Sequence, residues 1–246
     1  MSWLDEIVGE MVKNLPKDAF TDWTFGFADI QRVVDLVEKA VEQNAAATAD
    51  AGRAATLGAA ADPSHSFVKN PVFAPMGQEL LKAELTFPRI LRSALLIAIY
   101  SHTEFLLLSW CESISQDPDV SKALRKTQKG ESYPARYLRY LRDNGTLAVG
   151  DFTTWPEWHE IDGYRAARNC LAHRGGVVDD EAEQRQIGAL PHIEIDKSGL
   201  QISEPMVHLL PGACRAAAET AKAFIGRVVA IAERDPRWAG PKRSST

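Results

Sequence analysis

Apolar residues recur at helical spacing along most of this chain. A short apolar pattern before Pro16 is followed by a longer one from Asp29, and both are typical of helices. The longer pattern fades into the alanine-rich tract 44–47, which has little apolar surface to bury. The two patterns are carried by Leu4, Ile7, Val8 and Met11, then by Ile30, Val33, Val34, Val37 and Val41.

Proline and glycine gather between residues 58 and 77. These residue types favour turns and loops, so a linker is expected there. We therefore expect an N-terminal helical extension plus linker over residues 1–75, a main helical domain over 76–236 and a flexible tail over 237–246.

The main domain opens with the best-defined helical pattern, which starts at Phe87-Pro88 and continues to about Ser109. Proline suits a first helical turn because its missing N–H would have no partner there. Shorter helices are expected over 118–128 and 134–142. A further helix is expected from about Pro156 to Arg174, where Gly175-Gly176 is a C-terminal stop signal.

The periodicity then changes from helical to alternating. Residues 192–195 and 200–203 alternate on either side of the turn sequence 196–199, which predicts a β-hairpin, and a third strand is considered around 206–209. A last amphipathic helix follows Pro211-Gly212. The expected fold is all-α: a helical bundle with a small β-hairpin insertion before the C-terminal helix.

Composition fits a globular protein, with 45% hydrophobic and 25% charged residues. The net charge of -5 argues against a protein that coats nucleic acid indiscriminately, but it leaves room for a local basic groove. Three widely spaced cysteines without a C-x-x-C pair argue against a disulfide framework or a structural zinc site, and favour a reducing compartment.

The sequence also bears on location. The acidic N-terminus lacks the basic start and apolar run of a secretory signal. The apolar stretch from Leu95 to Trp110 contains Ser101, His102 and Glu104, so a buried core helix is expected there, too short and too polar to span a membrane. We expect a cytoplasmic protein without membrane association.

Candidate chemistry is concentrated in the helix that ends at Arg174. Its apolar stripe of Ile161, Tyr164, Ala167 and Leu171 faces the core, whereas Arg165, Asn169 and His173 line up on a separate face flanked by Arg168. An imidazole can take a proton from a ribose 2′-hydroxyl, a guanidinium can bind phosphate, and an amide can orient either group. We expect no cofactor, and no metal cluster is apparent in the sequence.

The segment Arg168-Asn169-x-x-x-His173 resembles the R-x(4–6)-H signature of the HEPN superfamily in its common R-N-x-x-x-H form. The resemblance extends to the upstream helix with Phe-Pro-Arg-Ile-Leu-Arg and residues 99–104, the glycine pair, and the hairpin with its terminal helix, over roughly residues 80–235. It implies a helical bundle that dimerises through its motif helices, with Arg168 and His173 as catalytic pair, Asn169 as assistant and Glu104 as a supporting residue.

Simpler explanations exist for each of these residues. Basic side chains near a helix C-terminus can serve only to cap the exposed carbonyl groups. His102 and Glu104 can be a buried polar pair, and at i,i+2 they point to different faces, so we favour Glu104 as the contributor.

A basic segment over residues 122–142 is a candidate RNA-approach surface with interleaved tyrosines, although we expect the tyrosines in the core. Trp155 and Trp158 are likewise expected to be core or interface anchors rather than platforms for bases. The candidate RNA-binding residues are Arg125, Lys126, Lys129, Arg136 and Arg139.

These features predict a metal-independent endoribonuclease that acts on RNA as a homodimer, in a toxin–antitoxin or phage-defence setting with an antitoxin or regulatory partner. The alternative is a non-catalytic module that uses the same fold to bind a protein partner or a nucleotide. Nucleotide binding is less favoured, because no glycine-rich phosphate loop is present.

Overall fold

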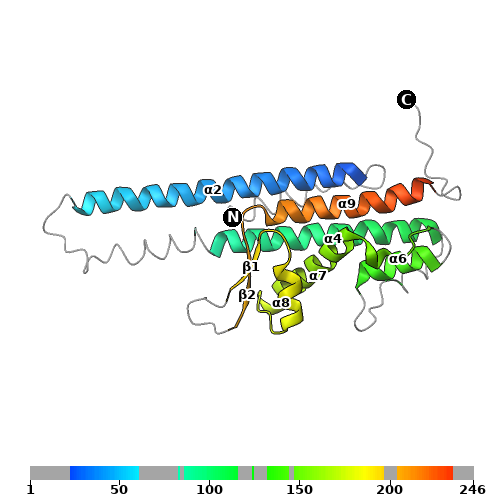
Figure 1. The fold of residues 1–246 in the computed structure, drawn as a ribbon. Helices are drawn as coiled ribbons and strands as arrows, with labels where there is room; N and C mark the ends of the chain where they lie inside the picture. Colours follow the sequence, from blue (N-terminus) through cyan, green and yellow to red (C-terminus); the bar gives the residue numbers. More distant parts are fainter. Residues whose placement is uncertain are drawn as a thin grey trace, which may run out of the picture.

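The computed structural model describes residues 23–60, 83, 86–115, 124, 132–143, 147–196 and 204–234. In these ranges the protein is an all-α bundle with one two-stranded antiparallel sheet (Figure 1). Its elements in chain order are α2 (Trp23–Ala60), α4 (Phe87–Ser115), α6 (Tyr133–Asp143), η2 (Phe152–Thr154), α7 (Pro156–Arg174), α8 (Glu181–Gly188), β1 (Ile193–Asp196), β2 (Met206–Leu209) and α9 (Ala213–Arg234).

Helix α4 is central to the bundle, because it contacts α2, α6, α7, α9 and β2. Its apolar residues Leu95, Leu96 and Leu107 are at most 2% exposed. The stretch Phe87–Glu112 is the one helix in the described ranges that is long and apolar enough to cross a membrane. From the sequence we expected the apolar stretch within it to be too short and too polar for that. More than half of its most apolar window is buried inside the bundle, as in a core helix.

Helix α2 packs against α4 and α9, with Phe27, Val34, Val37 and Val41 in the same core (Figure 1). The helix of the expected N-terminal extension therefore shares the core of the main domain. A buried ion pair joins the two helices: Arg92 Nη2 on α4 lies 2.7 Å from Glu38 Oε2 on α2. The patterns before Pro16 and over 61–82 lie outside the described residues, as does the expected helix 118–128 except for Leu124, which is helical and buried.

The hairpin differs from expectation in its second strand. Strand β1 pairs with 206–209, in the register Ile193 with Leu209 and Asp196 with Met206. The segment considered as a third strand is thus the direct partner of the first, while all of 200–203 lies outside the described residues. On its other side β2 is joined to the end of α7 by a bridge between Val177 and Met206.

Helix α8 was not expected from the sequence. It begins after Asp180, whose side chain accepts a hydrogen bond from the N–H of Glu183 and caps the helix. It packs against α7 and β1. Gly163 permits this close approach, since a side chain there would meet the Gln186 carbonyl of α8 at 3.4 Å and Leu190, just beyond α8, at 3.0 Å.

Candidate functional site

The motif helix α7 begins and ends where the sequence predicts. Pro156 occupies its first turn, and Gly175 ends it in the left-handed conformation with φ 62°. The N–H of Gly176 then donates to the carbonyl of Cys170 at 3.1 Å. Two further contacts fix this end: Arg89 of α4 donates to the Gly175 carbonyl, and Val207 of β2 donates to the Gly176 carbonyl. The helix end that carries His173 is therefore held by α4 and the hairpin.

The apolar stripe predicted for α7 faces the core at three of its four positions, whereas Leu171 is half-buried. Ile161, Tyr164 and Ala167 are at most 2% exposed and face the core. Arg165, Arg168 and Asn169 are half-buried, whereas His173 is exposed. Cys170, inside the motif, is a buried packing residue: its thiol donates to the Val177 carbonyl at 2.9 Å, and burial raises the pKa of the thiol to about 11.

Arg168 and Asn169 are in direct contact. Nη1 of Arg168 donates to Oδ1 of Asn169 at 2.9 Å, so the amide orients the guanidinium. The Nε group of Arg168 is buried and has no hydrogen-bond partner among the described residues. A buried donor without a partner is costly, so Arg168 is held in this position against an energetic penalty.

Glu104 on α4 lies close enough to the guanidinium groups of Arg168 and Arg165 to interact with them electrostatically. Burial raises the pKa of the Glu104 carboxyl to about 7, although the guanidinium groups of Arg168 and Arg165 act in the opposite direction. Tyr100 lies one turn earlier on α4, and its buried hydroxyl has no hydrogen-bond partner in the described part of the chain. The supporting residue inferred from the sequence thus sits beside Arg168, with a carboxyl that is partly protonated near neutral pH.

Helix α8 contributes contacts that the sequence analysis did not identify. Asp162 accepts from Arg165 Nε at 2.7 Å and from Gln186 Nε2 of α8 at 2.6 Å. Arg174 donates to Glu183 of α8 at 2.5 Å. These two bridges fix the polar face of α7 on both sides of the motif. The only sequence signal for them is the Asp180-x-x-Glu183 spacing of a helix start.

His173 is not drawn into the cluster of Arg168, Asn169 and Glu104. It lies one turn beyond Asn169 on the same helix, and within the described part of the chain it forms no hydrogen bond or ion pair. The imidazole is therefore available to an external ligand. Within that same part of the chain, no three His, Cys, Asp or Glu side chains come together in a group that could hold a metal ion.

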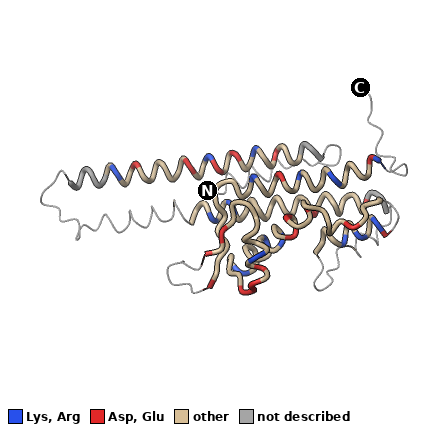
Figure 2. Tube along the Cα trace, in the orientation of Figure 1, with Lys and Arg blue, Asp and Glu red and all other residues tan. Residues whose placement is uncertain are grey.

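The candidate RNA-binding residues differ in whether the structure describes them and in how exposed they are. Arg125, Lys126 and Lys129 lie outside the described residues. Arg136 is buried in the single chain: it is 8% exposed, donates to the Leu124 carbonyl and lies over the Tyr133 ring. Arg139 is exposed on α6. Both charge signs occur along the helices, for example on α2 and α9 (Figure 2).

The structure also shows the surroundings of the aromatic residues that we expected in the core and of His102. Tyr137 is 3% exposed and Trp155 is 8% exposed, as expected of core residues. His102 faces α2, where its ring packs edge-on against Phe27 with centroids 5.3 Å apart. Its Nε2 atom is buried without a partner among the described residues, and burial lowers the pKa of the imidazole. His102 and Glu104 thus serve different interfaces.

Comparison of the chain with protein families, curated proteins and solved structures finds no match. Its function is therefore inferred from the residues and contacts described above.

Proposed function

We propose that this chain is a cytoplasmic, metal-independent endoribonuclease of HEPN type that works as a homodimer in a toxin–antitoxin or phage-defence setting. The observation that carries the proposal is the hydrogen-bonded pair of Arg168 and Asn169, with Glu104 in electrostatic reach of Arg168 and the exposed imidazole of His173 one turn further along the same helix. The R-N-x-x-x-H spacing supports it, because it places cation, amide and imidazole on one side of one helix end.

In the proposed reaction His173 takes the proton of the ribose 2′-hydroxyl, whose oxygen attacks the adjacent phosphorus. The bond to the 5′-oxygen breaks, and a protonated imidazole returns a proton to that oxygen. The products are a 2′,3′-cyclic phosphate and a 5′-hydroxyl. Arg168 binds the phosphate oxygens, where negative charge increases in the transition state. Asn169 holds the guanidinium through its 2.9 Å hydrogen bond.

A second copy has a suitable surface beside the site. Ile90 is 50% exposed and Phe105 is 48% exposed on α4, and the small residues Ala94 and Ala98 are exposed between them. By helical geometry these four residues share one side of α4, next to Glu104. Small residues between apolar ones allow two helices to approach closely. Dimerisation here would bring two motif helices to one cleft.

The direct test uses purified protein, a synthetic RNA and excess chelator. Wild type is expected to leave cyclic-phosphate ends, whereas His173→Ala and Arg168→Ala should each lose at least about a hundredfold in rate, as expected for loss of an acid–base or charge-stabilising group. His159→Ala is the matched control, because His159 is also exposed on α7 but lies outside the motif.

Equal cleavage by wild type and His173→Ala would contradict the site assignment. An inactive wild type that nevertheless binds a protein partner or a nucleotide through this face would favour the non-catalytic module. Induced expression of the same variants, with growth and total RNA followed, tests the toxin setting.

A further inference from the structure

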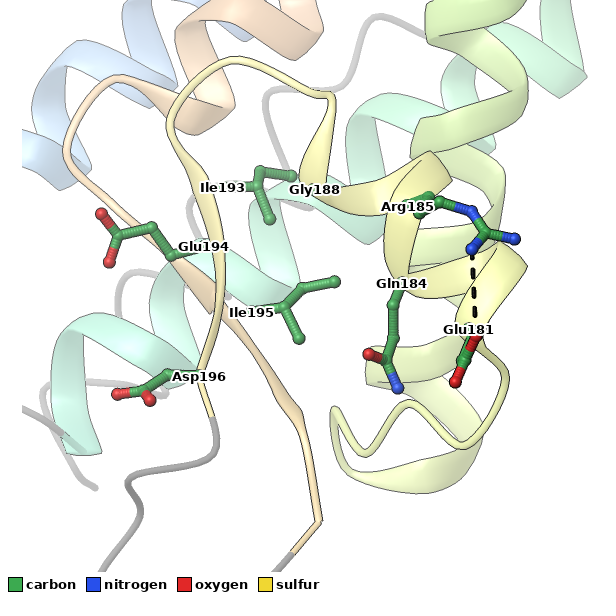
Figure 3. A pocket seen from close by; sticks show the side chains of 8 residues that line it. All are labelled: Glu181, Gln184, Arg185, Gly188, Ile193, Glu194, Ile195 and Asp196. Carbon is green, nitrogen blue, oxygen red and sulfur yellow. Dashed lines mark ion pairs between the residues drawn. The ribbon is translucent and has the colours of Figure 1, made fainter.

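A second surface lies between strand β1 and helix α8 (Figure 3). A cavity of about 760 Å³ opens there, lined by the four consecutive residues 193–196 of β1 and by α8. Its size is within the range of sites that hold ligands. None of the motif residues lines it.

The cavity extends along the outer edge of β1. Successive side chains of a strand point to opposite faces, so a cavity that touches four consecutive residues must pass the strand's edge. Ile193 and Ile195 point toward α8, whereas Glu194 and Asp196 point away from it (Figure 3). Ile193 is 5% exposed, and Ile195 is half-buried with its Cδ1 near Gly188 of α8.

The backbone of this edge offers hydrogen-bonding groups without partners among the described residues. The N–H of Leu210 donates to the carbonyl of His192 at 2.9 Å, so that pair is hydrogen-bonded across the hairpin. Bonded and non-bonded pairs alternate in an antiparallel ladder. Ile193 and Ile195 therefore direct their N–H and C=O groups away from β2. Within the described part of the chain neither has a backbone partner there.

The opposite edge of the sheet is closed. The N–H of Val207 donates to the Gly176 carbonyl at 2.9 Å, and the N–H of Val178 donates to the Pro205 carbonyl at 2.9 Å. Strand β2 is thus covered on both sides by described segments, whereas β1 has a described partner on one side. An open edge next to a cavity and a helix is the arrangement that accepts an added strand.

We propose that an extended, basic segment of a partner protein binds here by adding a strand to the outer edge of β1. Its apolar side chains would alternate with lysine or arginine. The apolar ones would lie on the side of Ile195 and α8, and the basic ones on the side of Glu194, because neighbouring side chains on one sheet face interact directly. Arg185 does not offset the Glu194 carboxylate, since it faces Glu181 at 3.9 Å on α8 (Figure 3).

Charge also selects against a second copy of the chain as occupant. Pairing β1 with β1 of another copy in antiparallel register around Glu194 would set the Glu194 carboxylate against the same carboxylate. Like charges opposite one another in a sheet are destabilising. A basic strand meets the complementary charge instead.

The probe is a fluorescein-labelled peptide of alternating lysine and valine, seven residues long, added to the full chain. Its matched control has the same composition with all lysines first, so it cannot alternate. Anisotropy is expected to show binding of the alternating peptide alone. Hydrogen exchange should slow at the amides of Ile193 and Ile195, which the added strand would bond.

Two variants test the two parts of the proposal. Glu194→Lys, an exposed change, should reverse the preference toward a peptide that alternates glutamate and valine. Ile195→Pro removes an outward N–H without removing a β1–β2 bond and should weaken binding roughly tenfold. Equal binding of both lysine peptides, or an unchanged peptide preference in Glu194→Lys, would overturn the proposal. These outcomes are independent of RNA cleavage, because the motif is left intact.

Discussion

At the scale of single residues, Glu104 combines a stability cost with a position beside the motif. Burial in the bundle raises the pKa of its carboxyl by more than the two neighbouring guanidinium groups lower it. Its pKa rises from an ordinary value of 4.5 to about 7. The folded protein thus binds this proton more tightly than the unfolded chain does, and stability falls as pH rises through this range.

Glu104→Gln is therefore expected to change the pH dependence of unfolding. The free energy of unfolding of the variant minus that of wild type should rise by up to about 3 kcal/mol between about pH 4.5 and about pH 8. The reason is that wild type loses stability as the buried carboxyl ionises, whereas glutamine cannot ionise. Urea unfolding at both pH values measures this change. Glu233→Gln, exposed on α9, is the control and should show no such change. A constant difference between Glu104→Gln and wild type across pH would contradict the burial of an ionisable carboxyl.

At the scale of elements, the sequence predicts helices that begin and end at local signals, but not those that depend on tertiary contacts. Helix α7 was predicted to its ends because Pro156 and Gly175 are local start and stop signals. Helix α8 was missed because it is eight residues long and mostly polar, and its stability comes from contacts with α7 and β1. The strand partner was misjudged because alternation in 200–203 and 206–209 gives equivalent local patterns.

The same distinction applies to the site. The spacing of Arg168, Asn169 and His173 predicted a shared polar face, since helical geometry is local. It could not predict that α8 supports that face through Gln186, or that Arg136 turns inward, because both depend on residues distant in sequence or on packing.

The contact between α2 and α4 gives a prediction at this scale. A methyl group at Gly26 would lie 2.7 Å from Nε2 of His102, whereas Gly52 on the same helix has open space. Gly26→Ala is expected to destabilise the fold by about 1 kcal/mol through overpacking, despite the better helix propensity of alanine. Gly52→Ala is the matched control and should stabilise by up to about 1 kcal/mol.

In a His102→Ala background, Gly26→Ala should cost much less stability than in wild type, because the smaller side chain makes room. Thermal unfolding of wild type, the three single variants and the double variant measures these differences. If Gly26→Ala were as stable as Gly52→Ala, the close packing of α2 on α4 would be contradicted.

At the scale of the whole molecule, the proposed activity depends on association of two copies. Ala98 is exposed in the single chain, so Ala98→Glu should leave its fold intact while placing a charge in the proposed interface beside Ile90 and Phe105. Sedimentation over a concentration series is expected to show a dimer for wild type and a monomer for the variant. RNA cleavage should fall at least about tenfold, because each monomer has only one motif helix.

Ala223→Glu, exposed on α9, makes the same chemical change away from this surface and should remain dimeric and active. For Ala98→Glu, residual activity should rise with protein concentration as the weakened dimer re-forms. A fully active monomer would show that one copy contains the complete site, so that Arg168, Asn169 and His173 act within a single helix. Loss of the dimer with the activity would instead link the exposed face of α4 to the motif of α7.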